Sequence, residues 1–248
     1  KHEEVPKSVK VEFMEMVRLP HDMQSQLEIY HEFCRSKNQF AADFLFRPNQ
    51  PSELVVCAKD QEGLLFKIST LLAFNQMNII EANIQTSRDN VFDVFKVVDP
   101  SGRPLDHSTY FFIRNQIKDD LRRVFVEQES IAEVFKGRNF LTQSEKHPYK
   151  DVKLKVKIIG RSVTLTTHDL FGTFMMETKV FSNMNVGIQR AVLHSAQGTA
   201  SNIFYLRPED LNKITQRKTR FESLLKEMLR PLIDSKLVLL ENTTEAAR

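Results

Sequence analysis

The chain contains few cysteines. Of its 248 residues only Cys34 and Cys57 are cysteine, and they do not form a C-x-x-C motif. A disulfide framework is therefore not expected, and a reducing cytoplasm is the expected compartment. Cys57 falls inside a predicted strand, which favours a buried free thiol.

Long apolar runs and a strong charge of either sign are also missing. No stretch approaches the roughly 20 apolar residues of a membrane-spanning helix, and the charged N-terminal region has no signal-peptide core. The formal net charge of +3 is too small to indicate a nucleic-acid partner. The sequence begins with Lys1 rather than methionine, so we expect a fragment of a longer protein.

The sequence also lacks the motifs of common catalytic and RNA-binding sites. It has no glycine-rich G-S-x-D-x-D segment, no nucleophile–base pair and no aromatic RRM motif. Two His-Asp pairs occur, His21-Asp22 and His168-Asp169, but neither has the further ligands that a metal site needs. We therefore expect no catalytic site, metal or cofactor within this stretch.

What the sequence does contain is an internal repeat. Asp60 and Gly63 recur as Asp169 and Gly172, and both differences are 109. A frame held without gaps over about forty-five positions indicates two copies of one unit. The same offset relates further apolar positions: Leu54 to Val163, Val56 to Leu165, Leu65 to Phe174, Leu71 to Val180, Leu72 to Phe181, Ile79 to Ile188, Ala82 to Ala191, Ile84 to Leu193, Val94 to Ile203 and Phe95 to Phe204.

Hydrophobic periodicity predicts the elements of each unit. Unit one has strands at 54–58, 80–84 and 91–98, helices at 64–75 and 108–135, and a last strand at 152–158. Unit two repeats this from Val163, with its second helix at 208–229 and a closing strand at 237–240. The predicted fold class is α+β, with two tandem ferredoxin-like βαββαβ units.

A helix is predicted at 20–37, outside the repeat, from the spacing of Met23, Leu27, Tyr30 and Cys34. We interpret residues 1–47 as a helical connector to an upstream domain, 48–159 as unit one and 160–248 as unit two.

Two local features carry further predictions. Strand 91–98 is apolar on both faces, so its second face should be covered by another layer or by a partner. Asn78 of unit one corresponds to Gly187 of unit two. Because Asn and Gly best tolerate a left-handed backbone, this pair predicts the tight turn between helix and strand.

The motifs of unit one resemble those of the ACT domain. They are D-x-x-G-L at 60–64, M-N-I at 77–79 and D-V-F at 93–95. The usual ACT loop has Arg-Pro between the Asp and the Gly, whereas this chain has Gln61-Glu62 and Leu170-Phe171, so it resembles a divergent member. The resemblance implies a small-ligand sensor, most often for an amino acid, attached to a metabolic enzyme.

A helical connector followed by two ACT units about 110 residues apart resembles the C-terminal region of the bifunctional uridylyltransferase/uridylyl-removing enzymes of the PII protein. That resemblance implies glutamine sensing in nitrogen regulation, and a parent with nucleotidyltransferase and hydrolase domains that uses Mg. Its implied partners are the PII protein, those catalytic domains and a possible second copy of the chain. An ACT-repeat sensor for another ligand and a ligand-free protein-interaction domain remain as alternatives.

The candidate binding residues lie at the two ends of the first helix of each unit. A helix N-terminus suits a carboxylate, a nearby Asp suits an ammonium group, and Gly allows close approach. In ACT pairs the ligand commonly lies between the loop of one unit and the far end of the helix of its neighbour. The candidates are Asp60, Gly63, Leu64, Asn78 and Ile79, with Asp169, Gly172, Thr173, Gly187 and Ile188.

Two observations weaken these assignments. Asp60 could simply be the N-cap of its helix. Unit two departs further from the pattern, since Glu177 replaces the core residue Ile68 and Thr173 replaces Leu64.

Overall fold

A computed structural model describes residues 6, 9, 10, 13, 23–87, 89–138 and 149–234. The predictions for residues 1–5, for His21-Asp22 and for the strand at 237–240 fall outside these ranges. Within them no helix has both the length and the apolarity to cross a membrane. Within them too, no three His, Cys, Asp or Glu residues gather as a metal site would require.

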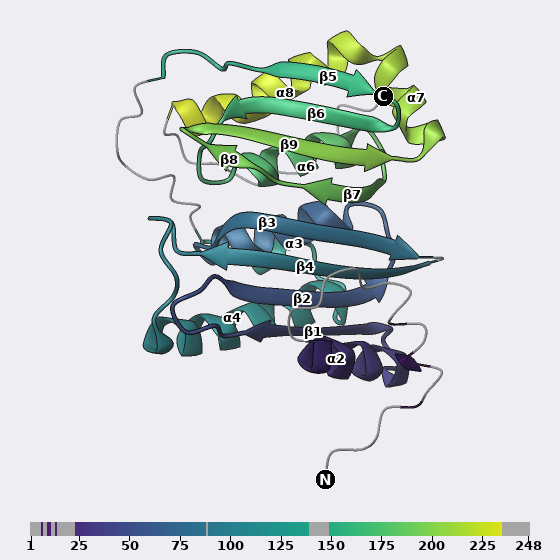
Figure 1. The fold of residues 1–248 in the computed structure, drawn as a ribbon, viewed down its shortest axis with the longest axis vertical. Coiled ribbons are helices and arrows are strands. Elements are labelled where there is room, and N and C mark those ends of the chain that lie inside the picture. Colours follow the sequence, from purple (N-terminus) through teal and green to yellow (C-terminus); the bar gives the residue numbers. More distant parts are fainter. Residues whose placement is uncertain are drawn as a thin grey trace.

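Unit one is a sandwich of one antiparallel sheet and one helical layer (Figure 1). Its strands lie in the order β1-β2-β4-β3. In chain order the elements are β1 (Phe40–Leu45), β2 (Ser52–Lys59), α3 (Leu64–Phe74), β3 (Asn78–Ser87), β4 (Asn90–Val98), α4 (His107–Phe125) and α5 (Ile131–Val134).

Unit two repeats this architecture with the strand order β5-β6-β9-β7, and the short β8 pairs with β9. The two antiparallel sheets with their helices confirm the predicted class of two tandem ferredoxin-like units. The elements are β5 (Lys155–Ile159), β6 (Ser162–His168), α6 (Thr173–Asn183), β7 (Ile188–Val192), β8 (Ser195–Ala196), β9 (Thr199–Leu206), α7 (Pro208–Gln216) and α8 (Lys218–Ile233).

The predicted place of the strand at 152–158 is wrong. The strand at 152–158 was expected to close unit one, but β5 pairs with β6 through the turn Gly160-Arg161 and opens unit two. A two-residue connection allows only an antiparallel hairpin, so these strands must share a sheet. In unit one the same edge is filled by β1, which pairs with β2. Each unit therefore runs ββαββα, with the sheet order of the expected fold but a different starting strand.

Both second helices are shorter than predicted. The helix expected to reach residue 135 ends at Phe125, and Gln128 then takes a left-handed backbone with φ 58°. Ser130 begins the separate α5 by accepting a hydrogen bond from the Glu133 amide. The second helix of unit two is broken at Arg217, whose φ of −121° is not helical, into α7 and α8.

The left-handed turn after each first helix lies two residues earlier than predicted. Gln76 and Asn185 have positive φ, whereas Asn78 and Gly187 do not. The amides of Met77 and Val186 donate to the carbonyls of Leu72 and Phe181 at 2.8 and 3.0 Å. These six-to-one bonds are the Schellman motif, which places the left-handed residue just before them. Gly187 therefore needs another explanation.

The second face of β4 is covered by the chain itself, as predicted. Helix α2 (Met23–Arg35) packs there, and its Tyr30 lies among Phe13, Phe92 and the buried free thiol of Cys57. The ring centroids of Phe13 and Phe92 are 5.4 Å apart, edge to face. The predicted connector helix is thus a third layer of unit one.

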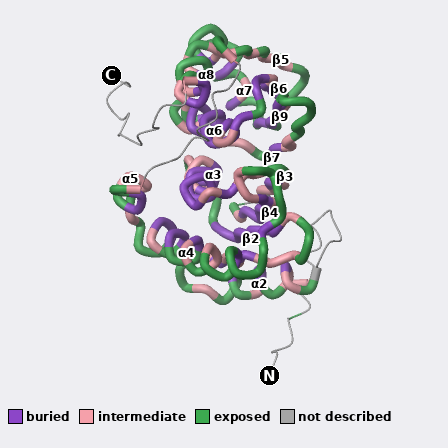
Figure 2. The backbone as a smooth tube through the Cα atoms, turned by 90° about the vertical axis from the view of Figure 1, so that its left-hand side faces the viewer, coloured by how far each residue is buried: buried purple, intermediate pink, exposed green. Residues whose placement is uncertain are grey.

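The two units pack side by side about a pseudo-two-fold axis. Strands β3 and β7 are neighbours in Figure 1, and the buried helices α3 and α6 are neighbours in Figure 2. Ser69 Oγ and Thr178 Oγ1 lie 2.8 Å apart, and these residues are themselves separated by the repeat offset of 109. Buried apolar side chains from both units form one continuous core.

Candidate ligand sites between the two units

Two cavities lie at the interface between the units, and the repeat relates them to each other. Each is built from the loop and first helical turn of one unit and from the end of the first helix of the other. Pocket one is lined by residues 60–66 with Ile84, Thr86, Val91, Asp93, Thr178, Phe181, Ser182, residues 185–188, Arg207, Asp210 and Lys213. Pocket two is lined by Ser69, Ala73, residues 77–79, 169, 170 and 172–175, Leu193, Ser195, Ala200 and Asn202.

The ten predicted site residues divide equally between the pockets. Asp60, Gly63, Leu64, Gly187 and Ile188 line pocket one. Asp169, Gly172, Thr173, Asn78 and Ile79 line pocket two. The structure therefore brings each loop together with the far helix end of the other unit, which is the arrangement that the ACT resemblance implies. Their role in binding a ligand stays a prediction.

The two pockets differ greatly in size. Pocket one has a volume of about 340 Å³, and pocket two has about 30 Å³. The smaller volume is close to that of a single water molecule. The larger one falls within the range of small-molecule sites. Of these two interface pockets, pocket one has room for a ligand the size of an amino acid and pocket two does not.

Pocket two is filled by its own side chains. Leu170, which stands where unit one has Gln61, is buried in its wall. The Thr173 hydroxyl lies 3.2 Å from the Leu170 amide and 3.3 Å from the His168 carbonyl. Asn202 donates to the buried Glu177 carboxyl at 2.7 Å. Burial raises the pKa of Asp169, and a hydrogen bond with Ser195 opposes that rise.

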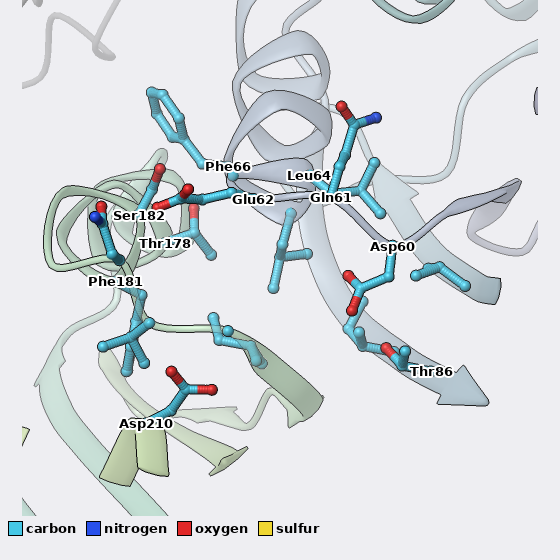
Figure 3. Close-up of a pocket in the computed structure, with 18 of the residues that line it drawn as sticks. Asp60, Gln61, Glu62, Leu64, Phe66, Thr86, Thr178, Phe181, Ser182 and Asp210 are labelled. Atoms are coloured by element: carbon cyan, nitrogen blue, oxygen red, sulfur yellow. The ribbon is translucent and has the colours of Figure 1, made fainter. Parts of the chain in front are cut away.

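The loop of pocket one has the same backbone turn as the loop of pocket two, where Gly172 is the N-cap of α6 with φ 87°. Gly63 is the N-cap of α3 with φ 72°, and no side chain caps this helix. The interpretation of Asp60 as an N-cap is therefore wrong. A Cβ at Gly63 would lie 3.0 Å from Ser182 Oγ of the other unit, so glycine serves both the left-handed turn and the contact between units. Figure 3 shows Asp60 and Leu64 on one side of the cavity and Phe181, Ser182 and Asp210 on the other.

Pocket one also carries a charged group that the sequence analysis missed. Arg207 is the N-cap residue of α7, and Asp210 and Lys213 lie in its first and last turns. Arg207 Nε donates to Asp210 at 3.0 Å, and Lys213 Nζ donates to it at 2.8 Å. Burial alone would raise the pKa of Asp210, but these two hydrogen bonds lower it. The corresponding residues of unit one lie in a loop, so the repeat gave no signal for this group.

Arg207 explains the glycine at position 187. A Cβ added to Gly187 would lie 2.8 Å from Arg207 Nη2 and 3.3 Å from Asp210 Oδ2. Any larger residue would displace the guanidinium from this wall of the pocket. Asn78, the counterpart in pocket two, has no such neighbour among the residues that line its cavity.

The charges of Asp60 and Arg207 act on each other across pocket one. Partial burial raises the pKa of Asp60, the positive charge of Arg207 lowers it, and Asp89 and Asp210 raise it further. The hydrogen bond to Asp210 raises the pKa of Arg207. The pocket thus places a carboxylate of unit one opposite a guanidinium of unit two.

A second residue missed by the sequence analysis lies on the sheet side of pocket one. Asp93 of β4 is 1% exposed and lines the cavity. Its Oδ1 accepts a hydrogen bond from the Gln85 amide at 3.3 Å, while its Oδ2 has no partner within the described ranges. Burial raises the pKa of Asp93 well above its usual value. The available signal was an acidic residue flanked on both sides by apolar residues within β4.

The fold and its interface pockets place the chain among tandem ferredoxin-like α+β proteins. No protein-family model matches it. A stretch of 71 residues is 32% identical to the ACT domain-containing protein ACR3 of Arabidopsis thaliana, and the match covers 29% of this chain and 16% of that protein. This similarity supports an ACT-domain region. An aspartate kinase from Synechocystis resembles the structure with a TM-score of 0.38 and 15% identity, over 76% of this chain and 28% of that one.

Proposed function

We propose that this chain is a regulatory module that binds a free amino acid in pocket one. The observation that carries the proposal is the pair of opposite charges, Asp60 and Arg207, across a cavity of about 340 Å³. An amino acid carries a carboxylate and an ammonium group close together. Arg207 suits the carboxylate because a guanidinium offers several donors in one plane, and Asp60 suits the ammonium.

The first turn of α3 adds to this charge pattern. Leu64 and Phe66 line pocket one, and the N-terminal end of a helix carries partial positive charge. The carboxylate would therefore lie between this helix end and Arg207. Binding would connect the loop of unit one to α7 of unit two, so the ligand would favour one arrangement of the two units over others. A differential affinity of this kind is what regulation by a ligand requires.

The specific form of the proposal is glutamine sensing within a PII uridylyltransferase/uridylyl-removing enzyme. It is supported by the order of the connector helix and the two ACT-like units. In that setting the catalytic domains and their Mg would belong to other parts of the protein, and the protein would be cytoplasmic. An upstream nucleotidyltransferase motif in the full-length gene would support this parent.

Calorimetric titration with L-glutamine and a panel of other amino acids tests the proposal. Saturable binding is expected, and both Asp60→Ala and Arg207→Gln should weaken it at least about tenfold, since each removes one charge partner. Binding of another amino acid would retain the sensor and exclude the glutamine form. Absence of binding by every amino acid would favour a protein-interaction domain and reject the proposal.

A further inference from the structure

In the proposed site, Arg207 and Asp60 would bind the carboxylate and ammonium groups of a ligand. The buried carboxyl of Asp93 takes no part in that. Its cross-strand neighbours, Val56 and Ile84, are both buried and apolar. Val91 and Phe95, which flank it on the same face of β4, belong to the apolar core. A carboxyl in such surroundings is costly unless a hydrogen-bonding group meets it.

The repeat provides a comparison within the same chain. The residue equivalent to Asp93 in unit two is Asn202, which lines pocket two and donates to Glu177 at 2.7 Å. Unit one has Ile68 at the position of Glu177, and this side chain has no polar atom. Asn202 in pocket two therefore has a partner, whereas Oδ2 of Asp93 in pocket one has none among the described residues.

We propose that Asp93 determines ligand specificity by accepting the end of a neutral polar side chain, a hydroxyl or a carboxamide. This inference rests on the proposed binding of an amino acid in pocket one. Hydroxyl and carboxamide groups both donate and accept, so either can pair with Oδ2. An apolar side chain of the same shape would leave the carboxyl buried and unpaired. An acidic side chain would bring a second carboxyl to a place where burial already disfavours negative charge.

Two isosteric pairs of ligands separate these cases. L-threonine and L-valine differ by a hydroxyl against a methyl group, and L-glutamine and L-glutamate differ by a carboxamide against a carboxylate. For the wild-type chain, calorimetry should show the first member of each pair binding at least about tenfold tighter, since a buried polar group left unpaired costs about that much in affinity.

The variant Asp93→Asn tests the residue itself. Asn retains an oxygen for the Gln85 amide, and Asn202 is the natural residue at the equivalent position, so folding should be preserved and is checked by thermal melting. Because the variant replaces the buried carboxyl with a neutral carboxamide, the preference for glutamine over glutamate should fall at least about fivefold or reverse. The matched control is Asp119→Asn on the exposed face of α4, which lines neither pocket and should leave both preferences unchanged.

The outcomes distinguish this inference from the function on which it rests. Saturable binding with equal affinities within both pairs, or preferences that survive Asp93→Asn, would overturn the role of Asp93 and leave the amino-acid site standing. Tighter binding of L-lysine than of L-glutamine would make Asp93 the partner of a cation and also overturn the inference. Absence of binding by every amino acid would overturn both.

Discussion

Glu177 lies in α6 with no solvent exposure, where the equivalent residue of unit one is Ile68. One carboxyl oxygen accepts a hydrogen bond from Asn202 at 2.7 Å, and the other has no partner among the described residues. Burial raises its pKa to about 8, and the Asn202 bond opposes that rise. The folded chain therefore keeps a proton on Glu177 that the unfolded chain, with a pKa near 4.3, releases.

This difference predicts how stability changes with pH. Between about pH 4.3 and pH 8 the folded state binds more protons at Glu177 than the unfolded state, so stability should fall as pH rises through this window. The slope from this group is at most about 1.4 kcal/mol per pH unit. Glu177→Gln has no proton to lose, and urea unfolding from pH 5 to pH 8 should show the variant gaining on the wild type. Parallel pH profiles would contradict the burial of a neutral acid.

For individual residues, the sequence predicted which positions line the pockets better than it predicted what each side chain does there. The offset of 109 residues was enough to sort all ten candidates into two groups. The spacing between strand, loop and helix is the same in both units, so corresponding residues lie at corresponding places in the two units. Arg207 could not be found in this way, since its part of the pocket exists only because α7 follows β9 directly. The proposed role of Asp93 depends on its Oδ2 having no hydrogen-bond partner among the described residues. Only the three-dimensional packing reveals this.

The interface between helices α3 and α6 gives a prediction at the element scale. Ser69 and Thr178 share a buried hydrogen bond on the pseudo-two-fold axis, and each hydroxyl also has a carbonyl of its own helix, Phe66 or Met175, within 3.1 Å. Removing one hydroxyl should cost about 1 kcal/mol, and removing both should cost less than the sum of the two.

A double-mutant cycle of Ser69→Ala and Thr178→Val, followed by urea unfolding, measures this coupling. A coupling energy of about 0.5–1 kcal/mol is expected. Ser69→Ala combined with Thr215→Val is the control, because the Thr215 hydroxyl bonds only to Leu211 within α7 among the described residues. That pair should be additive. Additivity in both pairs would mean that the helices pack without a specific polar contact.

Among the secondary-structure elements, the edge strands are those whose unit could not be predicted from the sequence. Strand β5 was predicted as a strand, but it was assigned to the end of unit one, whereas it forms a hairpin with β6 of unit two. In unit one the corresponding connection spans residues 46–51, so the repeat frame does not extend without gaps to the outer strands. Which sheet an edge strand joins depends on backbone pairing between segments that are distant in the sequence. Hydrophobic periodicity does not predict this pairing.

At the scale of the whole molecule, the repeat suggests two equivalent sites and the packing provides for one. Pocket one holds about 340 Å³ and pocket two about 30 Å³, although both are built from the loop of one unit and the end of the first helix of the other. The linings differ: pocket two has Leu170 where pocket one has Gln61, and no counterparts of Arg207, Asp210 and Lys213 are among the residues that line it. The chain should therefore bind one amino acid, in pocket one, which both Asp60 and Arg207 line.

Stoichiometry and a matched pair of variants test this asymmetry. Calorimetric titration should give one site per chain, Asp60→Ala should weaken binding at least about tenfold, and Asp169→Ala should leave the affinity unchanged. A ligand that binds only the folded chain at a hundred times its dissociation constant should also raise the free energy of unfolding by about 2.7 kcal/mol. That increase should survive Asp169→Ala and be reduced in Asp60→Ala. Two sites per chain, or equal losses in the two variants, would show that pocket two opens to a ligand despite its filled interior.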